Sequence, residues 1–257
     1  MVRRRAVLLV GVGLLSGCSR ATKATTTTGP AARPATSSGS TGSETSSPPG
    51  KPTLDPGSSL VATAVNSRVT VWSEPGRGSR QRLANPTPSG GPLTFLVTEG
   101  APGWLKVLLP QRPNGSTGWI AQGQVGLTST PYRLVISMSA HRLDVFYEGR
   151  RQASHPVGVG KAATPTPTGT YYLTELIQPP DPDGAYGPYA FGLSAFSNTL
   201  KTFAGGPGQL GLHGTDAPHG LGHDVSHGCL RVSNRVIRQL AKQVPLGTPV
   251  EIRAAAR

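Results

Sequence analysis

The chain of 257 residues contains only two cysteines, Cys18 and Cys229. So few thiols exclude a disulfide-rich secreted scaffold and a zinc site made of four cysteines. Charged residues are also scarce, at 14%, and apolar residues make up 36%, which argues against a coiled coil or a helical bundle. The chain is instead rich in glycine (34) and proline (25), which is typical of turns, loops and linkers.

Acidic residues are few as well. Twelve Asp and Glu face 25 Lys and Arg, so the formal net charge is +13. Nucleic acid and an anionic cell envelope are two partners that such a charge suits. The sequence has no helix on which basic residues alternate with aromatic ones, so we predict no nucleic-acid partner and favour the envelope.

Residues 1–17 are predicted to be a lipoprotein signal peptide. A basic start, Arg3-Arg4-Arg5, precedes an apolar stretch that is too short to span a bilayer as a permanent helix. The following Leu15-Ser16-Gly17-Cys18 resembles the bacterial lipobox, in which the cysteine is acylated; an ordinary secretory signal is the alternative. This predicts an exported lipoprotein held to the cell membrane through Cys18 and facing the cell wall. Cys229 is then a lone free thiol that needs an explanation.

Residues 18–58 are predicted to be a disordered tether. Thr, Ser, Pro, Gly and Ala dominate this stretch, and few large apolar side chains are available to offset the entropy of ordering.

Residues 59–128 are predicted to form a small β-barrel. Short alternating runs separated by Gly- and Pro-containing turns indicate strands at 69–72, 93–97, 104–108 and 118–121. The pair Trp104-Leu105-Lys106-Val107 and Thr117-Gly118-Trp119-Ile120 resembles bacterial SH3-like domains. Such a domain is either a spacer or a wall-binding module.

Residues 131–254 form a second β-rich block. Strands are expected at 134–136, 143–147, 157–160, 170–177 and 249–252, with a hairpin turn at Glu148-Gly149. One helix is predicted, from Asn234 to Val244, because its apolar residues recur at helical spacing and Ser233 can cap it.

The densest group of reactive side chains runs from Leu210-Gly211-Leu212-His213-Gly214 to Ser226-His227-Gly228-Cys229-Leu230-Arg231. One interpretation is a thiol nucleophile. His213 or His227 would activate Cys229, an imidazole lowering the thiol pKa by ion pairing. Backbone N–H groups around Gly228 could hold an oxyanion. If the segment is extended, Arg231 lies on the same side as Cys229 and can bind a carboxylate.

A metal site is the second interpretation of this group. His219, His223 and His227 are spaced by four, as on one face of a helix, but the surrounding Pro and Gly residues disfavour a helix there. The third interpretation is a Gly-rich polar loop with a stray thiol. His141 and His155 have no partner in the sequence and are predicted to be structural or surface residues.

Taken together, these motifs resemble the L,D-transpeptidase catalytic domain of the YkuD-like family. The Gly211–Gly214 and Ser226–Arg231 motifs look like its signature, and Pro165-Thr166-Pro167-Thr168-Gly169-Thr170-Tyr171 resembles its upstream strand entry. The resemblance implies a mainly β chain, in which a small SH3-like β-barrel is followed by a β-sandwich-like catalytic domain with one C-terminal helix.

The resemblance also implies roles for individual residues. Cys229 would be the nucleophile and His213 the general base, with the Gly214 carbonyl as its partner. His227 would lie beside the thiol, its amide and those of Gly228 and Cys229 forming the oxyanion hole. Ser226 would order the loop, and Arg231 would contact a substrate carboxylate.

The implied reaction is 3→3 cross-linking of peptidoglycan stem peptides through a cysteine thioester, or L,D-carboxypeptidase cleavage when water is the acceptor. No metal or organic cofactor is expected, and the chain is expected to be a monomer. The alternative function is a metal-dependent or non-catalytic envelope lipoprotein that hydrolyses or binds peptidoglycan.

The loop 179–196 holds four aromatic residues among Gly and Pro, which is typical of an active-site lid. Tyr186 and Tyr189 are predicted to contact substrate from this lid. Phe191 and Phe196 are instead predicted to anchor the loop in the core.

Overall fold

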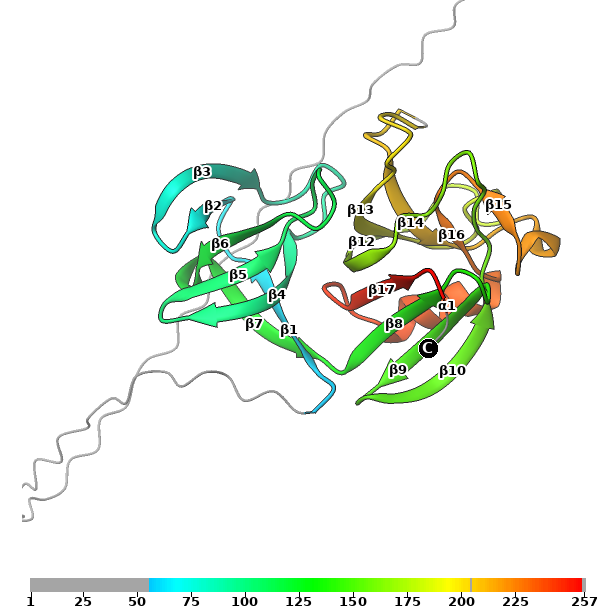
Figure 1. Ribbon diagram of the computed structural model, residues 1–257, viewed down its shortest axis with the longest axis horizontal. Helices are drawn as coiled ribbons and strands as arrows, with labels where there is room; N and C mark the ends of the chain where they lie inside the picture. The colour runs from blue at the N-terminus through cyan, green and yellow to red at the C-terminus, as the bar shows by residue number, and fades with distance from the viewer. Residues whose placement is uncertain (1–55, 204, 256–257) are drawn as a thin grey trace, which may run out of the picture. The chain divides into compact units, whose positions relative to one another are not determined.

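The computed structural model describes residues 56–203 and 205–255, all within one compact unit (Figure 1). The predicted signal peptide, Cys18 and the tether as far as residue 55 lie outside these residues. The described part is mainly β, as the sequence predicts, with a single α-helix. None of its helices is long and apolar enough to cross a membrane.

The first seven strands form one sheet, in the order β3-β2-β6-β5-β4-β1-β7. Their bounds are β1 (Ser59–Ala64), β2 (Arg68–Glu74), β3 (Arg77–Ala84), β4 (Thr94–Ala101), β5 (Trp104–Leu108), β6 (Thr117–Ala121) and β7 (Val125–Thr130), with a 3₁₀ turn η1 (Gln122–Gln124) before β7. Alternate residues such as Val69, Val71, Leu105 and Val107 are buried in a core of their own. The sequence therefore marked β2, β4, β5 and β6 correctly through this alternation.

Strand β3 was missed by the sequence analysis. It reads Arg-Gly-Ser-Arg-Gln-Arg-Leu-Ala, is exposed along nearly its whole length, and pairs only with β2 at the edge of the sheet. Such a strand has no apolar alternation to detect. Its arginines suit an edge strand, because charged side chains hinder unwanted pairing with other chains.

Eight of the remaining strands form a second sheet, in the order β10-β9-β8-β17-β12-β13-β14-β16, and β11 pairs with β15 separately. The bounds are β8 (Tyr132–Ser137), β9 (Arg142–Tyr147), β10 (Arg150–Pro156), β11 (Val159–Gly160), β12 (Gly169–Ile177), β13 (Ala190–Phe196), β14 (Gln209–His213), β15 (Asp224–Ser226), β16 (Leu230–Arg231) and β17 (Pro249–Arg253). Most neighbours are antiparallel, whereas β17 runs parallel to β8 and β14 runs parallel to β16.

Two local predictions in this block are confirmed. Glu148 and Gly149, both with positive φ (49° and 74°), make the two-residue turn that joins β9 to β10. The helix α1 spans Asn234–Gln243, and the Ser233 side chain accepts a hydrogen bond from the Val236 N–H at 3.3 Å.

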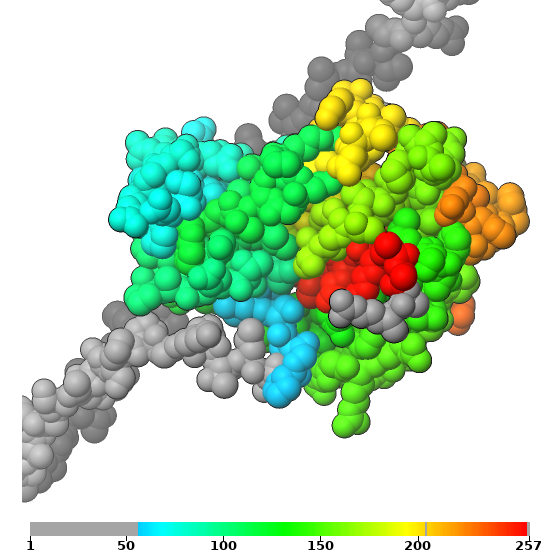
Figure 2. All heavy atoms as spheres, in the orientation of Figure 1, coloured from blue at the N-terminus to red at the C-terminus, as the bar shows by residue number. Residues whose placement is uncertain are grey.

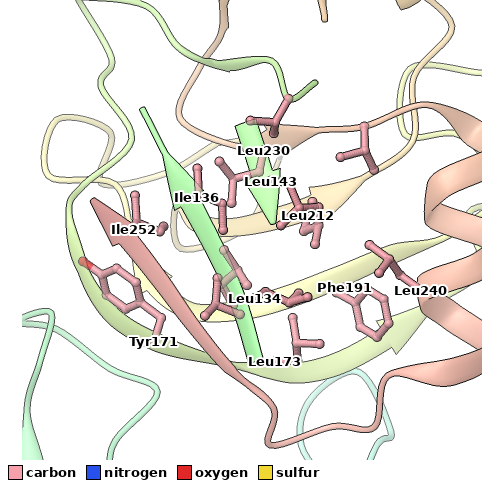
Figure 3. Packing of buried hydrophobic residues seen from close by; sticks show 14 of the residues in the cluster. Leu134, Ile136, Leu143, Tyr171, Leu173, Phe191, Leu212, Leu230, Leu240 and Ile252 are labelled. Carbon is pink, nitrogen blue, oxygen red and sulfur yellow. The ribbon is translucent and has the colours of Figure 1, made fainter. Parts of the chain in front are cut away.

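The core of this second block lies between the eight-stranded sheet and α1 (Figure 3). Leu134, Leu173 and Leu212 from three strands meet Ile237 and Leu240 of the helix, and all five side chains are buried. This packing fixes the strands that carry the histidine and cysteine motifs.

The Ser233 cap supplies a test of the fold. We expect Ser233→Ala to lower the free energy of unfolding by about 1 kcal/mol, because an amide of the first helical turn loses its acceptor. Ser233→Asp keeps an accepting oxygen and should stay close to wild type. Urea denaturation measures both, and equal stabilities of the alanine and aspartate variants would contradict the cap.

Candidate active site

Strands β14 and β16 bring the two signature motifs together. They run parallel, with Leu212 opposite Leu230 and His213 opposite Arg231. Both leucines are fully buried. Side chains alternate along a strand, so His213 and Arg231 lie together on the other face, and Cys229 directly precedes β16. The Arg231 charge acts on both groups, because it lowers the pKa of His213 and of Cys229.

His213 is held in one orientation by the next residue along the chain. Its side chain is buried, and Nδ1 lies 2.6 Å from the Gly214 carbonyl oxygen. A carbonyl only accepts, so Nδ1 carries the hydrogen and Nε2 keeps its lone pair. The Gly214 carbonyl thus stands at the position that the family resemblance implied for the partner of the base.

Asn234 supports this arrangement and was not singled out from the sequence. Its Oδ1 accepts a hydrogen bond from the Thr215 N–H at 2.8 Å, directly after Gly214. The Gly214 N–H donates to the Tyr189 carbonyl at 3.3 Å. The first residue of α1 and the strand β13 region therefore fix the peptide that orients the imidazole.

Burial dominates the protonation of both candidate groups. It lowers the pKa of His213 to about 4, against an opposing contribution from the Gly214 hydrogen bond, with Arg231 lowering it further. Burial raises the pKa of the Cys229 thiol, although the Gly211 backbone and Arg231 oppose this. At neutral pH the pair therefore consists of a thiol and a neutral imidazole. This corrects the expectation of a thiol acidified by an ion pair.

Ser226 organises the turn that leads to Cys229. Its Oγ donates to the Cys229 carbonyl at 2.6 Å and accepts from the Gly228 N–H at 3.0 Å. Gly228 has φ of +118°, a conformation that strains any residue with a side chain and therefore favours glycine. These two hydrogen bonds fix the turn, and the supporting role expected of Ser226 in the reaction stays a prediction.

The same contact changes the expected oxyanion hole. Because the Gly228 N–H is already donated to Ser226, it is not a free donor for a substrate oxygen. Within residues 56–203 and 205–255, no turn or side-chain hydrogen bond engages the N–H of His227 or of Cys229. The predicted oxyanion hole is therefore reduced from three N–H groups to two, those of His227 and Cys229.

Thr166 of the upstream motif and Thr164, directly before that motif, hydrogen-bond to the turn that leads to Cys229. Thr166 Oγ1 donates to the Gly228 carbonyl at 2.8 Å and accepts from the Gly160 N–H at 2.9 Å. Thr164 Oγ1 donates to the Ser226 carbonyl at 3.3 Å. From the sequence alone, this motif was interpreted only as the segment that leads into a strand. Its alternation of Thr and Pro was the available signal, because proline keeps such a loop extended and threonine supplies the hydroxyl.

Arg231 is fixed through its backbone. Its N–H and carbonyl both bond to Gly158, at 2.8 and 2.9 Å. The side chain is half-buried and positively charged beside His213 and Cys229, where it could meet an anionic substrate group.

His213, His219, His223 and His227 do not come together as the ligands of a common metal site in the described part of the chain. His219 lies in a 3₁₀ turn, η2 (Pro218–Gly220), and both His219 and His223 are exposed. His227 is exposed and stacks on Phe203, with ring centroids 5.4 Å apart. Among the residues with described positions, no group of three or more His, Cys, Asp or Glu could hold a metal ion. His141, expected to lack a partner, contacts the Asp224 carboxylate at 2.8 Å.

The four aromatic residues in the segment 179–196 differ in their exposure and contacts. Tyr186 is exposed and its ring lies 4.9 Å from the His213 ring. Tyr189 is instead half-buried against the core, and its hydroxyl accepts a hydrogen bond from Gln178, so its contact with substrate stays a prediction. Phe191 and Phe196 are buried, as predicted, but the prediction of a loop that runs to residue 196 is wrong, because both residues lie on strand β13.

Comparison with known proteins identifies the family. The model of the YkuD L,D-transpeptidase catalytic domain matches residues 131–252. The YkuD protein of Bacillus licheniformis is 31% identical over 201 residues, covering 77% of this chain and 96% of that protein. The YkuD protein of Bacillus subtilis is 34% identical over 122 residues, covering 48% and 66%. The chain belongs to the YkuD family of L,D-transpeptidases.

A solved structure of L,D-transpeptidase 3 from Mycobacterium tuberculosis, with a faropenem-derived adduct, aligns with 56% of this chain and 76% of that chain. The sequence identity is 19% and the TM-score 0.42. The predicted family is confirmed by the family match and the Bacillus relatives, and membership supports a peptidoglycan L,D-transpeptidase, which is an acyltransferase. The SH3-like and lipoprotein assignments stay predictions.

The Thr166 contacts supply a test of the site. Thr166→Val has nearly the same shape but leaves the Gly228 carbonyl and the Gly160 N–H without their partner. We expect it to lower the free energy of unfolding by about 2 kcal/mol. Thr166→Ser retains the hydroxyl and should recover most of the loss. Chemical denaturation of the three proteins measures this, and a valine variant as stable as wild type would refute the role of the hydroxyl.

The pKa of His213 supplies a second test. A base accepts a proton only when neutral, and His213 is neutral above about pH 4. The rate of Cys229 acylation at low substrate concentration should therefore fall as the pH drops through about 4, rather than through the ordinary histidine value of 6.5. Stopped-flow measurement over pH 3.5–8 records this limb. The same limb should persist in His227→Ala, and a limb near 6.5 that His227→Ala removes would exclude His213 as the base.

Proposed function

We propose that the chain forms peptidoglycan cross-links through a thioester on Cys229, with His213 as general base and then general acid. The observation that supports this best is the Nδ1–Gly214 contact of 2.6 Å on a buried histidine, whose strand pairs with the strand that directly follows Cys229. A neutral imidazole with its Nε2 lone pair free can take the proton of a neutral thiol as the thiol attacks.

In the first step, Cys229 Sγ attacks the carbonyl on the L-centre of the third residue of a tetrapeptide stem. The Sγ–C bond forms while the Sγ proton passes to His213 Nε2. The C–N bond to the terminal D-Ala then breaks, and the same proton goes to the leaving amine. The thioester remains on the enzyme.

The developing oxyanion would be held by the N–H groups of His227 and Cys229. Arg231 would bind a carboxylate of the stem peptide, since its guanidinium is the cation next to both reacting groups. Tyr186, exposed over the His213 ring, would contact the bound stem.

In the second step, the side-chain amine of another stem attacks the thioester carbon. Its proton passes to His213, the C–S bond breaks, and the proton returns to Sγ. The product is a 3→3 cross-link. Water as the acceptor would make the enzyme an L,D-carboxypeptidase. None of these steps calls for a metal or an organic cofactor.

We also propose that residues 59–128 are an SH3-like domain and that Cys18 carries a lipid anchor, placing the enzyme between membrane and wall. The first assignment is supported by paired tryptophan-bearing strands, with Trp119 opposite both Lys106 on β5 and Trp72 on β2. The second rests on the lipobox motif.

The nucleophile can be tested by intact-mass spectrometry after incubation with a carbapenem. Wild type should gain the mass of one ring-opened drug, since a thioester forms without loss of atoms. Cys229→Ala should gain none, and His213→Ala should form no adduct in the same time because no base accepts the thiol proton.

The controls separate the alternatives. A thiol alkylator should abolish activity on peptidoglycan stems and a chelator should not; the opposite pair of results would refute the cysteine mechanism. Loss of the adduct in His227→Ala but not in His213→Ala would exchange the roles of the two histidines.

A further inference from the structure

The described residues between β13 and β14, 197–203 and 205–208, reach one of the two histidines of the candidate site. Phe203 stacks on the His227 ring at 5.4 Å between centroids and 30° between planes, although 40% of its surface is exposed. The Phe203 and Gly206 backbones bond to each other in both directions, at 3.0 and 2.9 Å, which makes a tight turn. The segment therefore presents one aromatic ring to His227, two residues before the thiol.

The loop between β5 and β6 of the first sheet holds this segment at several points. Arg112 Nη1 donates to the Pro207 carbonyl at 2.7 Å, and Nη2 donates to the carbonyls of Ser197 and Leu200, both at 3.0 Å. Its guanidinium also lies 4.9 Å from the Phe196 ring centroid. One side chain thus ties together three carbonyls from both ends of the segment.

Asn114 fixes the start of the same segment. Its Nδ2 donates to the Phe196 carbonyl at 2.7 Å, and its Oδ1 accepts from the Phe196 N–H at 2.8 Å. The amide thereby pairs with one residue as a neighbouring strand would. Figure 2 shows the yellow atoms of the segment directly against the green atoms that precede β6.

Gly208 makes room for these contacts. It has φ of +72°, and a Cβ there would collide with the Leu200 carbonyl and approach Arg112 Nη2 to 3.1 Å. The Gly208 carbonyl in turn accepts from the Ser197 N–H at 2.8 Å, which closes the base of the segment.

We propose that Arg112 and Asn114 are positioning residues for acyl transfer. They hold residues 197–203 and 205–208 so that Phe203 orients the His227 imidazole and the backbone that leads to Cys229. Both residues lie outside the catalytic-domain match, which begins at residue 131, so the first sheet contributes to the competence of the site. This inference rests on the proposed thioester chemistry.

Single-turnover acylation by a carbapenem, followed by intact-mass spectrometry over time on the purified full chain, tests this. We expect Arg112→Met and Phe203→Ala each to slow acylation about tenfold, which is the loss of roughly one hydrogen bond from transition-state positioning. Arg112→Lys keeps the charge and one set of donors and should fall between. Arg68→Met removes an exposed arginine from β2 of the same sheet and should acylate like wild type.

A double-mutant cycle separates positioning from general destabilisation. If Arg112 acts through Phe203, the Arg112→Met/Phe203→Ala protein should acylate about tenfold slower than wild type, like either single variant, rather than about a hundredfold slower. If Arg112→Met fails to fold, Asn114→Leu replaces it, and the Asn114→Leu/Phe203→Ala protein is compared with its two single variants in the same way.

The outcomes are distinct. Wild-type rates in both the Arg112→Met and Asn114→Leu proteins, or additive losses in the double variants, would overturn the positioning role while leaving the thioester mechanism standing. Absence of a Cys229 adduct in wild type would instead refute the proposed function, and this inference with it.

Discussion

The parallel pairing of β14 with β16 is the constraint on which the site depends. The two strands come from separate motifs of the chain, and their register puts His213 opposite Arg231, with Cys229 directly before β16. A shift of one residue in that register would turn one set of side chains into the core. Leu212 and Leu230 prevent the shift, because both are fully buried where only apolar residues fit. Core packing and the placement of reactive groups are therefore decided by the same pairing.

Burial then sets the chemistry available to those groups. A charged imidazole or thiolate is costly in this environment, so His213 and Cys229 are both neutral at rest. The hydrogen bonds around them compensate by fixing geometry. Gly214 orients the His213 imidazole, Ser226 closes the turn, and Thr166 holds that turn against the strand-entry loop. This arrangement supports the proposed proton transfer during attack rather than a standing ion pair.

The regular parts of the fold were largely predictable. Alternating apolar residues marked strands such as β5 and β9, and helical spacing with a Ser233 cap marked α1. Strands that lack this pattern were not found. β3 is polar and lies at an edge, while β15 and β16 are too short to show any periodicity. Their existence depends on partners far away in the chain, which local patterns do not reveal.

The sequence by itself determined the family, because the Ser226–Arg231 motif and the upstream His213-Gly214 carry its signature in their residue types. Only the tertiary structure decided which histidine is buried against a carbonyl and which is exposed against Phe203. It also decided that the Gly228 amide is already occupied, and that Arg112 reaches carbonyls 85 and 88 residues further along the chain. Burial and long-range contacts produce these outcomes, and both arise only when distant segments pack together.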